Sequence, residues 1–129
     1  MRQGKKELSP AEWEIMNVIW QETKAVTVRS VVEKAYPKSE KAYTTVQTIM
    51  NILTEKGFLA RRKKNRLNYY QPTVTRNATL RNSLSRMSKR MFRGSMGTMA
   101  SFLIDSARLS PEELEELRRI LDEKSRGEE

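Results

Sequence analysis

Four short polar side chains recur at helical spacing in the middle of the chain: Thr44, Gln47, Thr48 and Asn51. Residues three and four apart share one face of a helix, so these side chains form an uncharged polar stripe. Hydroxyl and amide groups can pair with base edges in the major groove of DNA, and a threonine methyl group can contact the thymine methyl. Ordinary solvated helix faces carry Lys and Glu instead. The stripe therefore favours a base-reading surface, with a plain polar helix surface as the alternative; Tyr43 and Thr45 complete the set of candidates.

The opposite face of the same segment carries the apolar residues that must hold this stripe in place. They follow the i, i+3, i+4, i+7 pattern of a buried helix face: Val46, Ile49, Met50 and Leu53. Gly57 supplies a helix stop, because glycine adopts the left-handed conformation that commonly ends helices. The spacing predicts a helix over residues 43–56.

The chain beyond this helix is strongly basic. Its formal net charge is +9, and residues 56–104 contain twelve Lys and Arg but no Asp or Glu. Residues 105–129 reverse the balance, with nine acids against five bases. A one-sided basic segment is typical of a protein that binds a polyanion. The alternative is a solvated charge run that aids solubility, but soluble surfaces normally intersperse both signs.

A β-hairpin is predicted within the basic segment. Residues 58–63 and 67–71 read as two strands around Lys64, Asn65 and Arg66, and Asn65 tolerates the left-handed backbone of a tight turn. Basic side chains on such a hairpin can contact phosphates or the minor groove, which sets affinity and register without choosing sequence. These candidates are Arg61, Arg62, Lys63, Lys64 and Arg66.

The segments before the polar helix complete a recognisable order. Ser9 and Glu12 flank Pro10 as a capping box, which predicts a first helix to about Gln21. A short β-branched run over residues 25–28 predicts one strand, and a second helix follows over residues 29–36. Helix, strand, two helices and a basic hairpin is the order of a winged helix-turn-helix. We therefore expect a mainly α fold with a small β-hairpin.

Residues 74–129 are predicted to form a separate helical domain after a winged-helix DNA-binding domain over residues 1–73. A basic helix over residues 79–93, a break at Gly94 and Gly97, a short apolar segment over residues 99–104 and a capped final helix make up this part. Its apolar stripes are too thin to be buried alone, so we expect a homodimer, with packing on the winged domain as the alternative. The dimer candidates are Leu80, Leu84, Met87, Met91, Met99, Phe102, Leu103, Leu114, Leu117, Ile120 and Leu121.

The composition makes most enzymatic functions improbable. Cysteine and histidine are both absent, so the chain can form no disulfide, no Ser-His or Cys-His nucleophile, and no zinc site of the usual nitrogen and sulfur ligands. No run approaches ~18 apolar residues, and no apolar core follows residues 1–7 as in a signal peptide. We expect a cytoplasmic protein with no catalytic residues, metal or cofactor. A membrane-surface role for the basic helix is the weaker interpretation.

The chain resembles the penicillinase-repressor family of bacterial winged-helix regulators, the BlaI/MecI type. The similarity runs over nearly the whole chain and rests on the string from Leu8 to Met16 with Ile19 and Trp20, Tyr43 to Thr48, Leu53 with Glu55 to Gly57, and Arg66, Tyr70 and Pro72. The resemblance implies a homodimeric repressor that reads a palindromic operator. Some members of the family regulate antibiotic-resistance genes. A non-sequence-specific architectural DNA- or RNA-binding protein is the alternative function.

The family resemblance also implies a mode of release. Members from resistance systems are inactivated by proteolysis within the C-terminal domain, between Asn and Phe, and a membrane sensor metalloprotease is the implied partner. The matching pair here is Ser101 and Phe102, so the chain departs from the family pattern at the first position.

Overall fold

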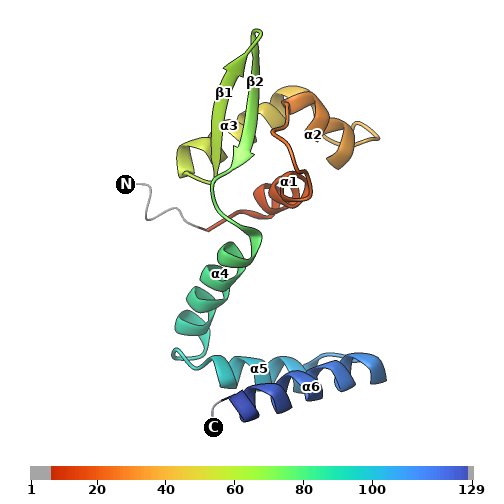
Figure 1. The fold of residues 1–129 in the computed structure, drawn as a ribbon, viewed down its shortest axis with the longest axis vertical. Coiled ribbons are helices and arrows are strands. Elements are labelled where there is room, and N and C mark those ends of the chain that lie inside the picture. Colours follow the sequence, from red (N-terminus) through yellow and green to blue (C-terminus); the bar gives the residue numbers. More distant parts are fainter. Residues whose placement is uncertain (1–6, 128–129) are drawn as a thin grey trace. The chain divides into compact units, whose positions relative to one another are not determined.

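The computed structural model describes residues 7–127 (Figure 1). The N-terminal residues 1–6, on which the expected lack of a signal peptide rests, lie outside this range. Six helices and one two-stranded antiparallel sheet follow one another within the described part, so the predicted mainly α fold with a small hairpin is confirmed. The chain divides into two compact units between Ser83 and Leu84. The division into a DNA-binding domain over residues 1–73 and a dimerisation domain over residues 74–129 remains a prediction.

The first helices of the N-terminal unit begin at capping boxes. In α1, Pro10–Trp20, the Ser9 hydroxyl and the Glu12 carboxylate satisfy each other's backbone amides, as predicted. In α2, Val28–Ala35, Thr27 and Ser30 do the same. The predicted strand over residues 25–28 was wrong, because Thr27 caps a helix at that point. Only Val26 pairs with the sheet, through one isolated bridge to Tyr70.

The predicted polar helix is α3, Tyr43–Lys56, with the expected bounds. Val46, Met50 and Leu53 have no exposed surface, and Ile49 packs partly buried against the same core. Gly57 ends the helix with φ of 92°, a conformation that residues with a Cβ rarely adopt. The buried face therefore fixes the rotation of α3 and leaves its polar stripe outward.

The hairpin consists of β1, Leu59–Lys64, and β2, Leu67–Pro72, paired from Leu59 with Pro72 to Lys64 with Leu67. Asn65 and Arg66 form the connecting turn with φ of 52° and 67°. Two successive left-handed residues match the twist of a tight hairpin. The buried residues of the two strands, Leu59 and Tyr70, join the core formed by α1, α2 and α3.

The remaining helices are α4, Arg76–Met91, α5, Met96–Ser106, and α6, Pro111–Gly127. The predicted break is present at Gly94, whose φ is 83°, but Gly97 lies inside α5. The short apolar segment over residues 99–104 therefore belongs to a full helix, which Ser95 caps by accepting from the Thr98 amide. α4 also begins three residues before the predicted Thr79, since the Thr75 hydroxyl accepts from the Ala78 amide in its first turn.

Candidate nucleic-acid interface

The N-terminal half of α3 presents its polar side chains to solvent. Thr44, Thr45 and Thr48 are exposed, Gln47 is half-buried, and the Tyr43 ring is 40% exposed. Ala42 precedes the helix and provides no side-chain cap, so its first amides are not satisfied by a capping side chain. This end of α3 can therefore donate and accept hydrogen bonds through both side chains and backbone.

Asn51 differs from the other candidates on this stripe. Its Oδ1 accepts a hydrogen bond from the Tyr70 hydroxyl at 2.8 Å and another from Arg61 Nη1 at 2.8 Å. Tyr70 is 1% exposed, so its hydroxyl has a buried position. Asn51 thus links α3 to both strands of the hairpin, and its side-chain oxygen stabilises the fold through these two hydrogen bonds.

The hairpin carries the other predicted candidates. Arg62, Lys63, Lys64 and Arg66 are exposed, and Arg61 is exposed while bonded to Asn51. Alternation along β1 places Arg61 and Lys63 on one face and Arg62 and Lys64 on the other. The hairpin is therefore basic on both faces.

A groove of about 540 Å³ brings three segments of this unit together. Three sequence candidates line it, Tyr43, Gln47 and Arg66, and it adds Arg29 and Asn68, which sequence reasoning missed. The Arg29 guanidinium lies over the Tyr43 ring, 5.4 Å from its centroid. No local spacing signal marks Arg29, because the two residues meet only when α2 packs against α3.

The C-terminal end of α3 is held by a largely buried ion pair. Lys56 Nζ donates to both carboxylate oxygens of Glu12, at 2.7 and 3.0 Å, and to the Glu7 carbonyl at 3.3 Å. The two side chains are 16% and 8% exposed. The same Glu12 carboxylate caps α1 through the Ser9 amide at 2.8 Å. This contact fixes α3 to the start of α1.

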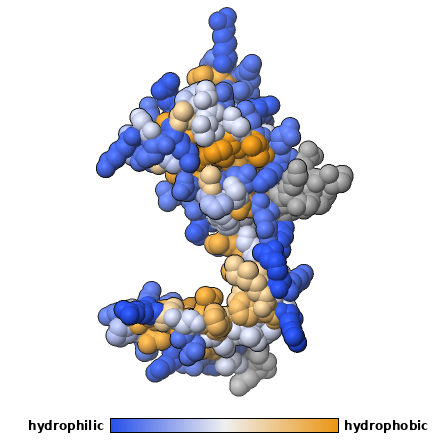
Figure 2. All heavy atoms as spheres, turned by 180° about the vertical axis from the view of Figure 1, so that it is seen from behind, coloured by the Kyte–Doolittle hydropathy of each residue, from blue (hydrophilic) through white to orange (hydrophobic). Residues whose placement is uncertain are grey.

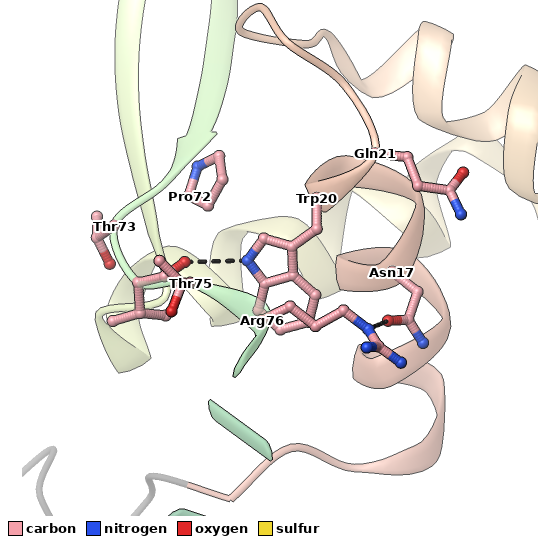
Figure 3. A pocket seen from close by; sticks show the side chains of 8 residues that line it. Asn17, Trp20, Gln21, Pro72, Thr73, Thr75 and Arg76 are labelled. Atoms are coloured by element: carbon pink, nitrogen blue, oxygen red, sulfur yellow. Dashed lines mark hydrogen bonds between the residues drawn. The ribbon is translucent and has the colours of Figure 1, made fainter. Parts of the chain in front are cut away.

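A second, larger hollow of about 880 Å³ lies between α1 and the connection from β2 to α4 (Figure 3). Trp20 Nε1 donates to the Val74 carbonyl at 3.0 Å, and Arg76 Nε donates to Asn17 Oδ1 at 3.0 Å. The Trp20 ring also packs 5.9 Å from the Trp13 ring. These contacts anchor the start of α4 on α1.

Burial, reinforced by a 2.7 Å hydrogen bond from the Tyr36 hydroxyl to Glu14, raises the pKa of the Tyr36 phenol well above its ordinary value of 10.0.

Among residues 7–127, acidic side chains form no cluster of three that could hold a metal ion. Over the same range, no helix has the length and apolar character that crossing a membrane requires.

Residues 8–123 match the family model described as penicillinase repressor. The chain belongs to the penicillinase repressor family. It is 29% identical over 118 residues to the methicillin resistance regulatory protein MecI of Staphylococcus aureus strain N315, covering 92% of this chain and 95% of that protein. It is 29% identical over 117 residues to the penicillinase repressor of Bacillus licheniformis, covering 91% of each.

The solved structures to which this chain is similar include the DNA-binding domain of the repressor BlaI in solution. The two align with a TM-score of 0.49 and 30% identity, over 55% of this chain and 85% of that chain.

Proposed function

We propose that this chain represses transcription by binding operator DNA, with α3 in the major groove and the β1–β2 hairpin on the backbone. The observation that carries the proposal is the set of uncharged polar side chains on α3, with Thr44, Thr45 and Thr48 exposed and Gln47 half-buried, beside a basic hairpin. Amides and hydroxyls discriminate bases, while Arg and Lys on the hairpin contribute sequence-independent affinity. Membership of a repressor family supports the same function.

A homodimer is the proposed functional form. In the unit from Leu84 onward, large apolar side chains remain exposed on a single chain, including Met91 at 63%, Phe102 at 59% and Leu121 at 62%. Figure 2 shows hydrophobic residues on the surface of this unit. Apolar surface of this extent is characteristic of an interaction site. A two-fold partner would cover it and present two copies of α3 to a palindromic operator. Met99 is 4% exposed within one chain, so it supports the unit's own packing.

Release through cleavage by a membrane sensor metalloprotease is the proposed route of induction, as the family resemblance implies. β-Lactam resistance genes are the proposed targets, in line with the names of the two relatives. The candidate bond between Ser101 and Phe102 lies inside α5, and both residues are exposed. A protease would need α5 to open locally, since cleavage sites favour frayed and loop segments. A cut would divide the proposed dimer surface and lower the effective concentration of the second half-site contact.

Binding assays on two duplexes test the proposal. The first duplex carries DNA from upstream of the gene that encodes this chain, with the protected sequence found by footprinting, and the second has the same length and a random sequence. Gln47→Ala should weaken operator binding by ~1–3 kcal/mol and leave random binding nearly unchanged. Arg62→Ala should weaken both and make the salt dependence shallower.

The alternative function, a non-sequence-specific architectural DNA- or RNA-binding protein, predicts a different result. Gln47→Ala would then reduce binding to operator and random duplexes equally, and no protected site would be found. Sedimentation at micromolar concentration tests the dimer separately, because a monomeric full chain would contradict it without touching base readout.

A further inference from the structure

The groove of about 540 Å³ in the N-terminal unit is bordered by arginines from two different segments. Arg29 comes from the first turn of α2, and Arg66 comes from the hairpin turn. Neutral polar side chains line the space with them: Ser30, Gln47 and Asn68. Guanidinium groups and neutral donors around a shared groove suit a phosphate-bearing ligand.

Arg29 is oriented before any ligand arrives. Its side chain is exposed, yet its guanidinium lies 5.4 Å from the centroid of the Tyr43 ring. A cation over an aromatic face is attracted by the ring quadrupole, so the contact narrows the conformations that Arg29 samples. Less side-chain freedom is then lost when Arg29 binds an anion.

Arg66 occupies a backbone position that disfavours it. Its φ is 67°, directly after Asn65 with φ of 52°. Asparagine tolerates this left-handed region, whereas the second position of such a turn favours glycine. Strained positions of this kind persist at functional sites, where the side chain has a use that offsets its conformational cost. Arg66 lines the groove, where its guanidinium can contact a bound phosphate.

Geometry selects DNA backbone as the ligand. A sugar-phosphate strand always separates a major groove from the adjacent minor groove. With α3 in the major groove and the hairpin reaching past its edge, that strand must pass between them. Glu33 lines the same groove one helical turn after Arg29, so its carboxylate disfavours a phosphate at that end.

We propose that this groove seats one phosphate-bearing strand of the operator between Arg29 and Arg66, with the Tyr43 ring as the positioning group for Arg29. The inference rests on the proposed function and adds a DNA contact from α2. Arg29 then contributes to affinity for DNA of any sequence, and Tyr43 affects binding mainly by positioning Arg29.

The test measures the salt dependence of binding by the full chain to operator and random duplexes. Arg29→Gln should weaken both complexes several-fold and lower the salt slope by about 0.9 for each chain bound. Lys34→Gln is the matched control, because Lys34 lies on the same helix but pairs with Glu22 outside the groove. It should leave the slope unchanged. Equal slopes for the two variants would overturn the proposal.

Two further variants separate binding from folding. Arg66→Gly should raise the urea midpoint, since glycine relieves the turn, and should nevertheless weaken DNA binding. Unchanged binding by a stabilised Arg66→Gly chain would refute the role of Arg66. Tyr43→Phe keeps the ring under Arg29 and should keep the salt slope of the parent chain, whereas Tyr43→Leu should lower the slope as Arg29→Gln does and add little to it. If the losses of DNA affinity caused by Tyr43→Leu and Arg29→Gln multiply in the double variant, Tyr43 does not act through Arg29.

Failure of the proposed function would look different. A parent chain without preference for any upstream sequence would contradict operator reading. The slope change of Arg29→Gln would still be measurable on random DNA, because phosphate contacts do not depend on sequence.

Discussion

Replacing Lys56 by methionine tests how strongly the ion pair to Glu12 holds α3 in place. The substitution keeps most of the side-chain length but removes the charge that donates to both Glu12 oxygens at 2.7 and 3.0 Å. Glu12 is buried at 6% exposure, so its carboxylate would lose its main partner without regaining water. Removing one partner of a buried pair costs about 3–5 kcal/mol.

The structure favours the lower end of that range. Glu12 would keep the hydrogen bond from the Ser9 amide at 2.8 Å and a favourable place at the N-terminus of α1. We therefore expect Lys56→Met to lower the free energy of unfolding by about 3 kcal/mol. Glu12→Gln can still accept from Ser9, and combining it with Lys56→Met should cost less than the two single changes together.

Urea unfolding followed by tryptophan fluorescence measures these changes, because Trp13 and Trp20 both lie in α1. Lys34→Met is the matched control: its pair with Glu22 is 52% and 28% exposed, so we expect a loss of about 0–1 kcal/mol. If Lys56→Met costs no more than Lys34→Met, or if the double variant is strictly additive, the ion pair does not anchor α3.

Three other predictions concern the same unit. Gly57→Ala should lower the free energy of unfolding by about 1–2 kcal/mol in urea, because φ of 92° disfavours a Cβ although the space around it is open; no loss would contradict the strain. Asn51→Ala should cost about 1–3 kcal/mol by leaving the Tyr70 hydroxyl unpaired, and a loss of DNA affinity without loss of stability would instead make Asn51 a base reader. Because the pKa of the Tyr36 phenol is higher in the fold than its unfolded value near 10.0, the free energy of unfolding should be unaffected by this group below that pH and should fall as the pH rises above it. Tyr36→Phe should flatten the stability decline above that pH in urea titrations, and an unaltered decline would show that other groups cause it.

The sequence predicts features that depend on neighbours along the chain. The bounds of α3 follow from its apolar spacing and Gly57, and the Ser9 capping box fixes the start of α1. Local rules failed where two signals competed. The β-branched run over residues 25–28 resembled a strand, yet Thr27 could cap a helix, and Gly97 resembled a break although Ser95 begins α5 before it.

The sequence by itself determined the charge asymmetry, the polar stripe and the mainly α fold with a hairpin, because composition and short-range periodicity encode them. Only the tertiary structure decided which stripe residues face outward freely and which serve the fold. Asn51 belongs to the predicted stripe but accepts hydrogen bonds from Tyr70 and Arg61. Arg29, on another helix, lies over the Tyr43 ring. Such contacts join residues far apart in the chain, and their geometry depends on how the buried faces of α1, α2, α3 and the hairpin pack together.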